Sequence, residues 1–323
     1  MFKKEVFAAL IIVLVGWSEF AHAQDPQFTQ FYANPIYLNP AFAGTARCPR
    51  LIMNYRNEWP ALSGTFVTYS VSYDQHIDGL QGGMGLVILQ DQAGEGTVNT
   101  TTGNLMYSYR LNVNRSFSLK AGFQAGYMQK KVDWEKLTFG DMIDPRYGFI
   151  YETKETQVSD TRGNLDLSAG VLGFSKQYFG GLAVHHLTQP KEGFVDQNLA
   201  KLPMKITAHA GAIIPIDETD EANISPNILY QKQQDFWQLN LGIYINKGPI
   251  VGGLWYRQAE KNSDAFIALV GFQQGMIKFG YSYDVTLSKL SNASAGSHEF
   301  SFALQFECRP KKRKFRAISC PSF

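Results

Sequence analysis

The stretch Phe66–Tyr73, FVTYSVSY, alternates between two kinds of side chain. Phe66, Thr68, Ser70 and Ser72 form a set that leans polar, whereas the residues between them are valine and tyrosine. A period of two residues is that of a β-strand with two different faces. The stretch therefore predicts a strand that lies between an apolar and a more polar environment.

The same alternation recurs from about residue 50 to the end of the chain. The candidate segments number about 14, each roughly ten residues long, which is the length that a tilted membrane strand needs. Long loops at 132–162, 188–202 and 286–295 follow odd-numbered strands, and most short turns follow even-numbered strands. This sorting is typical of a barrel with short periplasmic turns and long extracellular loops. We therefore predict an all-β fold, a transmembrane outer-membrane antiparallel β-barrel.

The last such segment is HEFSFALQF, residues 298–306. Phe300, Phe302, Leu304 and Phe306 alternate with residues that are polar or small. We expect this strand to pair with the first strand, near residues 51–57, because that pairing removes both edges of the sheet.

The N-terminus predicts the compartment. Two lysines precede a short apolar run, and Ala21-His22-Ala23 then supplies a small-x-small cleavage pattern. These features predict a cleavable secretory signal peptide and an outer-membrane location for the mature chain. The predicted divisions are a signal peptide at 1–23, a periplasmic lead-in at 24–49, the barrel at 50–306 and a basic periplasmic tail at 307–323.

Composition agrees with an exported barrel. Of the 323 residues 45% are hydrophobic, yet the mean hydropathy is −0.19, so apolar and polar residues are interleaved. The formal net charge is +2, which gives no reason to expect nucleic acid as a partner.

The predicted lead-in is rich in proline and aromatic residues. Pro26, Pro35 and Pro40 exclude long helices and regular ladder pairing. Its phenylalanines and tyrosines leave a second arrangement open, in which the segment plugs the lumen of the barrel.

The tail beyond the last strand carries a compact cationic cluster. One interpretation is a solvated terminus without a specific function. The other is a segment that docks to an acidic periplasmic protein or to anionic polymer. Of the three cysteines, Cys308 and Cys320 could form a short disulfide loop that leaves Cys48 odd, or all three could stay as thiols. The candidate docking residues are Arg309, Lys311, Lys312, Arg313, Lys314 and Arg316.

The longest loop, at 132–162, holds many aromatic side chains for an exposed segment. Such side chains need burial, either as a lid over the barrel mouth or against a partner protein. The candidate partner-binding residues are Trp134, Phe139, Asp141, Asp144, Arg146, Tyr147, Phe149 and Tyr151.

No motif for catalysis, a cofactor or a metal stands out in the sequence. The adjacent His185 and His186 should point to opposite faces of a strand, so they should not converge on one metal. No G-x-S-x-G elbow is present, and nothing singles out a serine nucleophile. We therefore predict no enzymatic activity and no cofactor, and rank an outer-membrane lipid hydrolase or acyl transferase last.

Several segments resemble the PorP/SprF family of Bacteroidetes. The resemblance covers nearly the whole mature chain in order, which makes it specific. It implies a component of type IX secretion and gliding motility that is needed to secrete or attach exported proteins such as adhesins. It implies no catalytic residues. The segments are DPQFTQFYANPIYLNPAFAG (25–44), NYRNEWPAL (54–62), VDWEKLTFGDMIDPRYGFIY (132–151), AVHHLTQP (183–190), KLPMKITAHAGAIIPI (201–216), ISPNILYQ (224–231), GPIVGGLWYR (248–257) and KFGYSYDVTLSKLSNASAGSHEFSF (278–302).

Two functions from different classes follow from these patterns. The first is a non-enzymatic outer-membrane component of type IX secretion, whose partners are the secretion machinery, a cargo adhesin and a periplasmic peptidoglycan-associated protein. The second is an outer-membrane pore or small-solute transporter, because a barrel of about 14 strands has a lumen that wall side chains alone do not fill.

Overall fold

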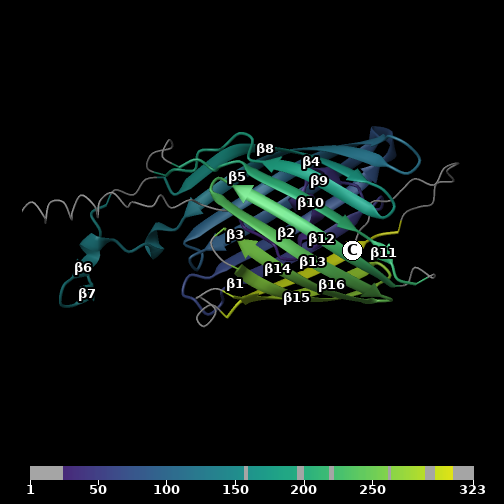
Figure 1. The fold of residues 1–323 in the computed structure, drawn as a ribbon. Coiled ribbons are helices and arrows are strands. Elements are labelled where there is room, and N and C mark those ends of the chain that lie inside the picture. The colour runs from purple at the N-terminus through teal and green to yellow at the C-terminus, as the bar shows by residue number, and fades with distance from the viewer. Residues whose placement is uncertain are drawn as a thin grey trace, which may run out of the picture.

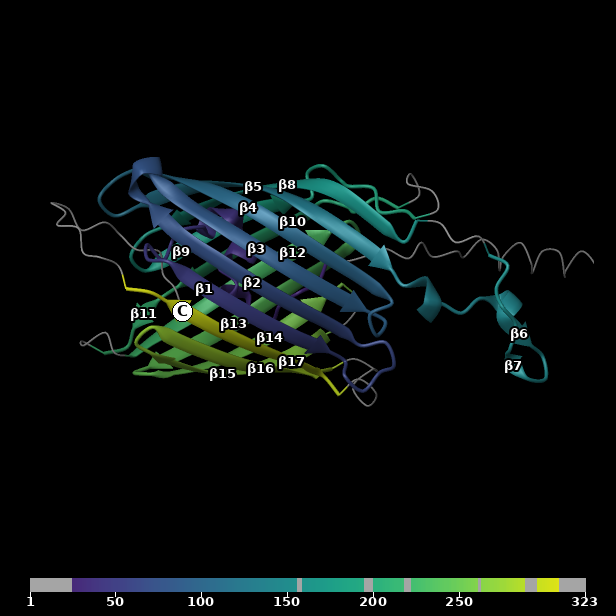
Figure 2. The same ribbon diagram turned by 180° about the vertical axis from the view of Figure 1, so that it is seen from behind.

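The computed structural model describes residues 25–155, 159–194, 200–217, 222–260, 263–287 and 295–307. Within these ranges fourteen antiparallel strands close into a barrel, because β1 pairs with β17 and β10 pairs with β12 (Figures 1 and 2). The predicted fold is confirmed. The predicted signal peptide and residues 308–323 of the predicted tail lie outside the described residues. The wall strands are β1 (Arg50–Glu58), β2 (Phe66–Ile77), β3 (Gly82–Ala93), β4 (Val98–Asn112), β5 (Ser118–Val132), β8 (Thr161–Phe174), β9 (Tyr178–His185), β10 (Lys205–Ala212), β12 (Ala222–Gln233), β13 (Phe236–Lys247), β14 (Ile250–Ala259), β15 (Ser263–Gln274), β16 (Ile277–Thr286) and β17 (Ser297–Gln305).

Alternation places each wall side chain either in the lumen or on the outer surface. In β2, Ser70 and Ser72 are buried toward the lumen, whereas Tyr69 and Val71 are more than 40% exposed on the outside. An apolar outer surface is what lipid requires, and the inner surface is free to be polar. The two faces predicted from FVTYSVSY are therefore confirmed.

The closing strand pairs as its pattern predicts. The β1–β17 ladder runs from Arg50 opposite Gln305 to Glu58 opposite Ser297. Glu299 faces the lumen with no exposed surface, and Phe300 is 40% exposed on the outside. Together with the β10–β12 ladder, this ladder closes the barrel, so each of the fourteen described wall strands has a partner on both sides.

The connections sort by length between the two ends of the barrel. The long connections 133–160, 186–204 and 287–296 lie at one end, which we call the outer end. The two-residue turns 248–249 and 275–276 lie at the other end, together with Arg50 and Gln305. The longest connection carries β6 (Ile143–Asp144) and β7 (Gly148–Phe149), which project well beyond the wall (Figures 1 and 2).

Residues 25–49, predicted as a periplasmic lead-in, lie inside the barrel, so the lumen plug left open by the sequence is the arrangement observed. The plug contains η1 (Phe31–Ala33), α2 (Pro35–Leu38) and η2 (Pro40–Phe42), and prolines at the starts of the last two suit such short turns. No helix in the described parts of the chain is both long and apolar enough to cross a membrane.

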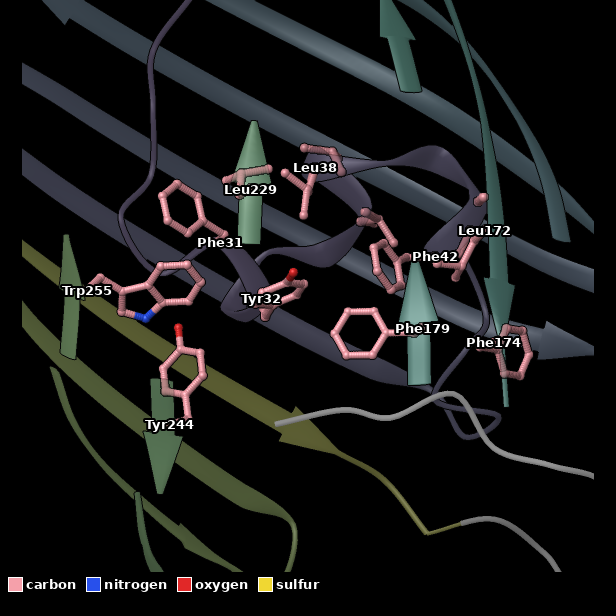
Figure 3. Close-up of a cluster of buried hydrophobic side chains, with 14 of the residues drawn as sticks. Phe31, Tyr32, Leu38, Phe42, Leu172, Phe174, Phe179, Leu229, Tyr244 and Trp255 are labelled. Carbon is pink, nitrogen blue, oxygen red and sulfur yellow. The ribbon is translucent and has the colours of Figure 1, made fainter. Parts of the chain in front are cut away.

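The plug and the wall share one apolar cluster. Figure 3 shows plug residues Phe31 and Tyr32 beside Trp255 of β14 and Phe179 of β9, and Phe31 meets Trp255 edge-on with ring centroids 5.3 Å apart. Aromatic pairs of this kind add stability beyond the area that they bury. The protein's buried core therefore lies between plug and wall, inside the barrel.

Two wall glycines let the plug backbone lie directly on the sheet. A Cβ at Gly83 would collide with the carbonyl oxygen of Ala43, and one at Gly122 would collide with the backbone nitrogen of Ala41. In the sequence these glycines fit strand curvature. In the structure they also leave the space that the plug occupies.

Candidate functional site

The half of the plug nearer the outer end of the barrel is held by a buried carboxylate of β17. Glu299 accepts hydrogen bonds from the backbone N–H groups of Thr29, at 2.5 Å, and Gln30, at 3.1 Å. Arg56 of β1 lies beside it and pairs with Asp284 of β16 at 3.1 Å. Paired and hydrogen-bonded charges of this kind satisfy one another away from water. They fasten the plug through its backbone as well as through its aromatic side chains.

The end of the plug farther from the outer end of the barrel is fastened in the same manner. Asp74 of β2 accepts the backbone N–H of Gly44 at 2.8 Å and also pairs with Arg50 at 2.8 Å. Ser108 of β4 donates to the carbonyl oxygen of Ala43 at 2.7 Å. The plug is thus bound to the wall on both sides of its apolar middle.

At the outer end the plug meets a histidine between two carboxylates. His186 lies 2.8 Å from Asp25 and 2.9 Å from Asp166, and Lys205 lies 3.6 Å from Asp25. Burial opposes the charge on His186, but the two carboxylates outweigh it and raise its pKa to about 10. Burial likewise opposes the charge on Asp25, and His186 and Lys205 hold the pKa of Asp25 well below its ordinary value. His186 and Asp25 are therefore both charged near neutral pH.

The prediction that the adjacent histidines face opposite ways is wrong. β9 ends at His185, whose Nε2 lies 3.3 Å from the carbonyl oxygen of Leu38 in the plug. His186 has a φ of +56°, a left-handed conformation that turns its ring back toward the plug. Strand alternation stops at the last strand residue, so both rings contact the plug.

The structure organises the predicted partner-binding loop around two aspartates. Asp144 accepts the backbone N–H groups of Arg146 and Tyr147 at 2.8 and 2.9 Å and the hydroxyl of Tyr151 at 2.9 Å. The Arg146 N–H, followed by the Tyr151 hydroxyl, holds the pKa of Asp144 below its ordinary value. Asp144 thus shapes the β6–β7 hairpin itself.

Asp141, three residues before Asp144, also organises the loop through hydrogen bonds. It accepts the backbone N–H of Lys154 at 2.6 Å, and this bond, together with the Thr153 hydroxyl, lowers the pKa of Asp141. Trp134 and Phe139 stack on each other near the base of the loop, with ring planes 15° apart.

Three aromatic side chains of this loop remain turned outward. Tyr147 is 72%, Phe149 59% and Tyr151 52% exposed. Above the plug the barrel encloses a cavity of about 580 Å³, and no described residue of the loop lines it. We call residues 133–155 the outer arm, because they extend away from the barrel mouth (Figure 1).

The predicted cysteine arrangement needs a correction. Cys48, at the end of the plug, is disulfide-bonded and is not the odd cysteine. Cys308, Cys320 and the predicted docking residues Arg309, Lys311, Lys312, Arg313, Lys314 and Arg316 lie outside the described residues.

Sequence reasoning missed the residues that hold the plug. Arg56, Asp284 and Glu299 are charged residues at lumen-facing positions of strands, where charge needs a partner. That feature is visible in the sequence as a charge on the polar face of an alternating segment. What the sequence does not contain is the identity of the partners, because Thr29 and Glu299 are 270 residues apart.

Comparison with known proteins places these observations in a family. A family described as "Type IX secretion system membrane protein PorP/SprF" matches residues 20–304. No curated protein matches the chain.

Among solved structures, the barrel is similar to two proteins of Acinetobacter baumannii and one of Pseudomonas aeruginosa. CdiB shares 9% identity and a TM-score of 0.46 over 80% of this chain, which spans only 60% of CdiB. The outer membrane protein Omp33 also gives 9% and 0.46, over 81% of this chain and 100% of Omp33. A FadL homologue gives 12% and 0.44, over 88% and 98%. These likenesses carry no argument about function.

The family match covers the plug and the wall strands almost to the end of β17, and the closed barrel gives the chain its place in the outer membrane. The chain belongs to the PorP/SprF family of type IX secretion system membrane proteins.

Proposed function

We propose that this protein is a non-enzymatic outer-membrane component of the type IX secretion and gliding machinery that supports secretion or surface attachment of a cargo protein such as an adhesin. The observation that carries the proposal is the family match over residues 20–304. The closed and plugged barrel supports it. A lumen occupied by the protein's own chain suits a scaffold better than a channel for solutes.

The outer arm is the docking surface that we assign to the cargo. Its hairpin is rigidified by Asp144 and presents Tyr147, Phe149 and Tyr151 to solvent at the end where the long loops gather. Exposed aromatic side chains on an ordered support are typical of protein interaction sites.

The basic tail is the second docking surface of the proposal. Both ends of the barrel wall, Arg50 and Gln305, lie at the end opposite the outer arm, which supports a periplasmic position for the tail. Its arginines and lysines suit an acidic partner there, such as a protein of the machinery or one associated with peptidoglycan.

The alternative function, a pore or small-solute transporter, requires the plug to leave the lumen. The contacts of Glu299, Asp74 and the aromatic cluster all oppose that movement. Purified protein in a planar bilayer that conducts ions or solutes without any substitution would favour the alternative.

Deletion of the gene followed by surface proteomics tests the proposal. We expect loss of at least one type IX cargo from the cell surface. Unchanged secretion and attachment of all such cargo would contradict the proposed role altogether.

Complementation with variants then separates the two docking surfaces. Replacing Tyr147, Phe149 and Tyr151 by serine should abolish cargo display while the barrel still reaches the outer membrane. Tyr178→Ser is the matched control, because Tyr178 is equally exposed, at 62%, but lies at the opposite end of the barrel. Removing residues 307–323 should leave a folded barrel with weaker coupling to its periplasmic partner, and normal display by that truncation would assign the tail no role.

A further inference from the structure

The cavity above the plug has the size of a ligand site. Its volume of about 580 Å³ falls within the range of about 300–1,000 Å³ that small-molecule sites occupy. Plug residues such as Phe28 and Asn34 close it below, and the wall strands surround it. It therefore opens toward the outer end of the barrel, and we call it the vestibule.

The vestibule offers no free positive charge. Every cationic side chain among its described lining residues is paired with a carboxylate, so phosphates and other anions find no unpaired partner. The pairs are Arg56 with Asp284 at 3.1 Å, Arg257 with Asp284 at 3.0 Å, Lys130 with Glu192 at 2.8 Å, Lys205 with Asp25 at 3.6 Å and His186 with Asp25 at 2.8 Å.

One wall of the vestibule instead carries a row of neutral polar side chains. Thr100, Thr102 and Asn104 occupy successive lumen-facing positions of β4, about 7 Å apart, and Gln124 follows on β5. None of the four forms a side-chain hydrogen bond with another described residue, although Gln124 is only 5% exposed. Because these side chains line the cavity, their hydroxyl and amide groups are open to water or to a bound molecule.

The wall is shaped around this row. Gly126 of β5 lies directly opposite Asn104, and a Cβ there would collide with the Oδ1 of Asn104. The aliphatic lining residues Leu89, Met106 and Met128 are each at most 5% exposed, and the lining also includes the aromatic rings of Phe28, Trp59 and Phe66.

Aromatic side chains stand at the rim beside the row. Trp59 and Phe66 pack edge to face with centroids 6.0 Å apart, and Phe66 is 41% exposed. Trp59 has a φ of +54°, a conformation rare for a bulky residue, and its backbone N–H donates to the carbonyl oxygen of Gly296 at 3.0 Å. The backbone thus holds an indole ring at the entrance.

We propose that the vestibule binds an uncharged glycan chain. Hydroxyl and amide side chains both donate and accept, which matches the dense hydroxyl groups of a sugar, and aromatic rings pack against the C–H faces of sugar rings. An extended peptide is often recognised through free strand edges, and none occurs among the described residues of the vestibule. Among its described lining residues Asp91 is a carboxylate without an ion pair, and it accepts the Thr68 hydroxyl at 2.6 Å.

Binding of uncharged linear hexasaccharides of glucose, mannose or N-acetylglucosamine to the purified full-length protein tests the proposal. We expect one of them to bind with a Kd below about 1 mM. Asn104→Ala and Thr102→Val should each weaken that binding about five- to tenfold, because each removes one hydrogen-bonding group. Thr101→Val is the matched control, since Thr101 lies on the outer face of the same strand and should bind unchanged.

The outcomes decide the proposal independently of secretion. Absence of binding by every hexasaccharide, or binding that Asn104→Ala leaves unchanged in a folded barrel, overturns it, as does selective binding of uncharged peptides. Barrel folding of each variant is checked by its shift on heating in gel electrophoresis. Competition by the bacterium's own lipopolysaccharide, or by glycopeptides from its exported proteins, identifies the source of the glycan, and competition by neither indicates a free saccharide.

Discussion

The Glu299 carboxylate of the last strand lies 2.5 Å from the backbone nitrogen of Thr29, near the start of the plug. This contact joins the two ends of the described chain inside the barrel. Because Arg56 also lies beside Glu299, the carboxylate serves the plug and the wall together. It links closure of the barrel to occupation of its lumen.

Replacing this carboxylate should loosen the plug. Glu299→Gln keeps the shape but removes the charge that pairs with Arg56 and accepts two N–H groups, so we expect a loss of about 2 kcal/mol in the free energy of unfolding. Urea unfolding of the purified barrel measures it. Glu307→Gln, at the exposed end of β17, is the control, and equal stability of the two variants would show that the contact contributes nothing.

Filling the space at Gly122 should displace the plug locally. Gly122→Val places a branched side chain where the Ala41 backbone now lies, at a cost of about 1–3 kcal/mol from overpacking. We expect the variant to conduct ions in a planar bilayer more than the native protein does. Ala121→Val introduces the same side chain on the lipid side of β5 and should leave conductance unchanged, whereas equal conductance of all three proteins would contradict the plug's sealing role.

The outer fastening of the plug should weaken as the pH rises above about 6.5. The pKa of His186 is raised from 6.5 to about 10, so its paired charge stabilises the fold fully below pH 6.5 and the contribution is lost as the pH rises through about 10. His186→Gln should cost about 2 kcal/mol at pH 6 and almost nothing above pH 10. Thermal unfolding of both proteins across this range measures the difference.

Two controls sharpen the pH experiment. His298→Gln replaces a histidine that lies beside Tyr281 and Tyr283, away from the plug, and controls for the loss of an imidazole as such. The lowered pKa of Asp25 gives a contribution that is present above its ordinary pKa of 3.8 and is lost only in strong acid. A plug stability that stays constant between pH 6.5 and 10 would contradict the assigned charges.

Removing the aspartate at the hairpin should disorder the outer arm without affecting the barrel. Asp144→Ala deletes the acceptor of three hydrogen bonds, so limited proteolysis should cut the arm faster. The free energy of unfolding of the barrel should stay unchanged, because the site is exposed and far from the wall strands. An unchanged rate of cleavage would mean that Asp144 does not shape the hairpin.

Local pattern was enough to predict the wall. Alternation in FVTYSVSY sorted lumen from lipid, loop lengths sorted the two ends, and the polar and aromatic residues of HEFSFALQF predicted the closing strand. These features follow from nearest-neighbour geometry along a strand, so a single sequence contains them. The same reasoning failed at His186, because one left-handed residue after the strand reverses the expected side.

By itself the sequence therefore determined the barrel, its closure and its compartment, since lipid allows a chain of alternating strands only one kind of closed structure. The tertiary structure alone decided that residues 25–49 fill the lumen, that Glu299 meets Thr29 and that Thr100, Thr102 and Asn104 face an open vestibule. Those outcomes depend on contacts between residues far apart in the chain, and the alternation of side chains along a strand does not specify which of them meet.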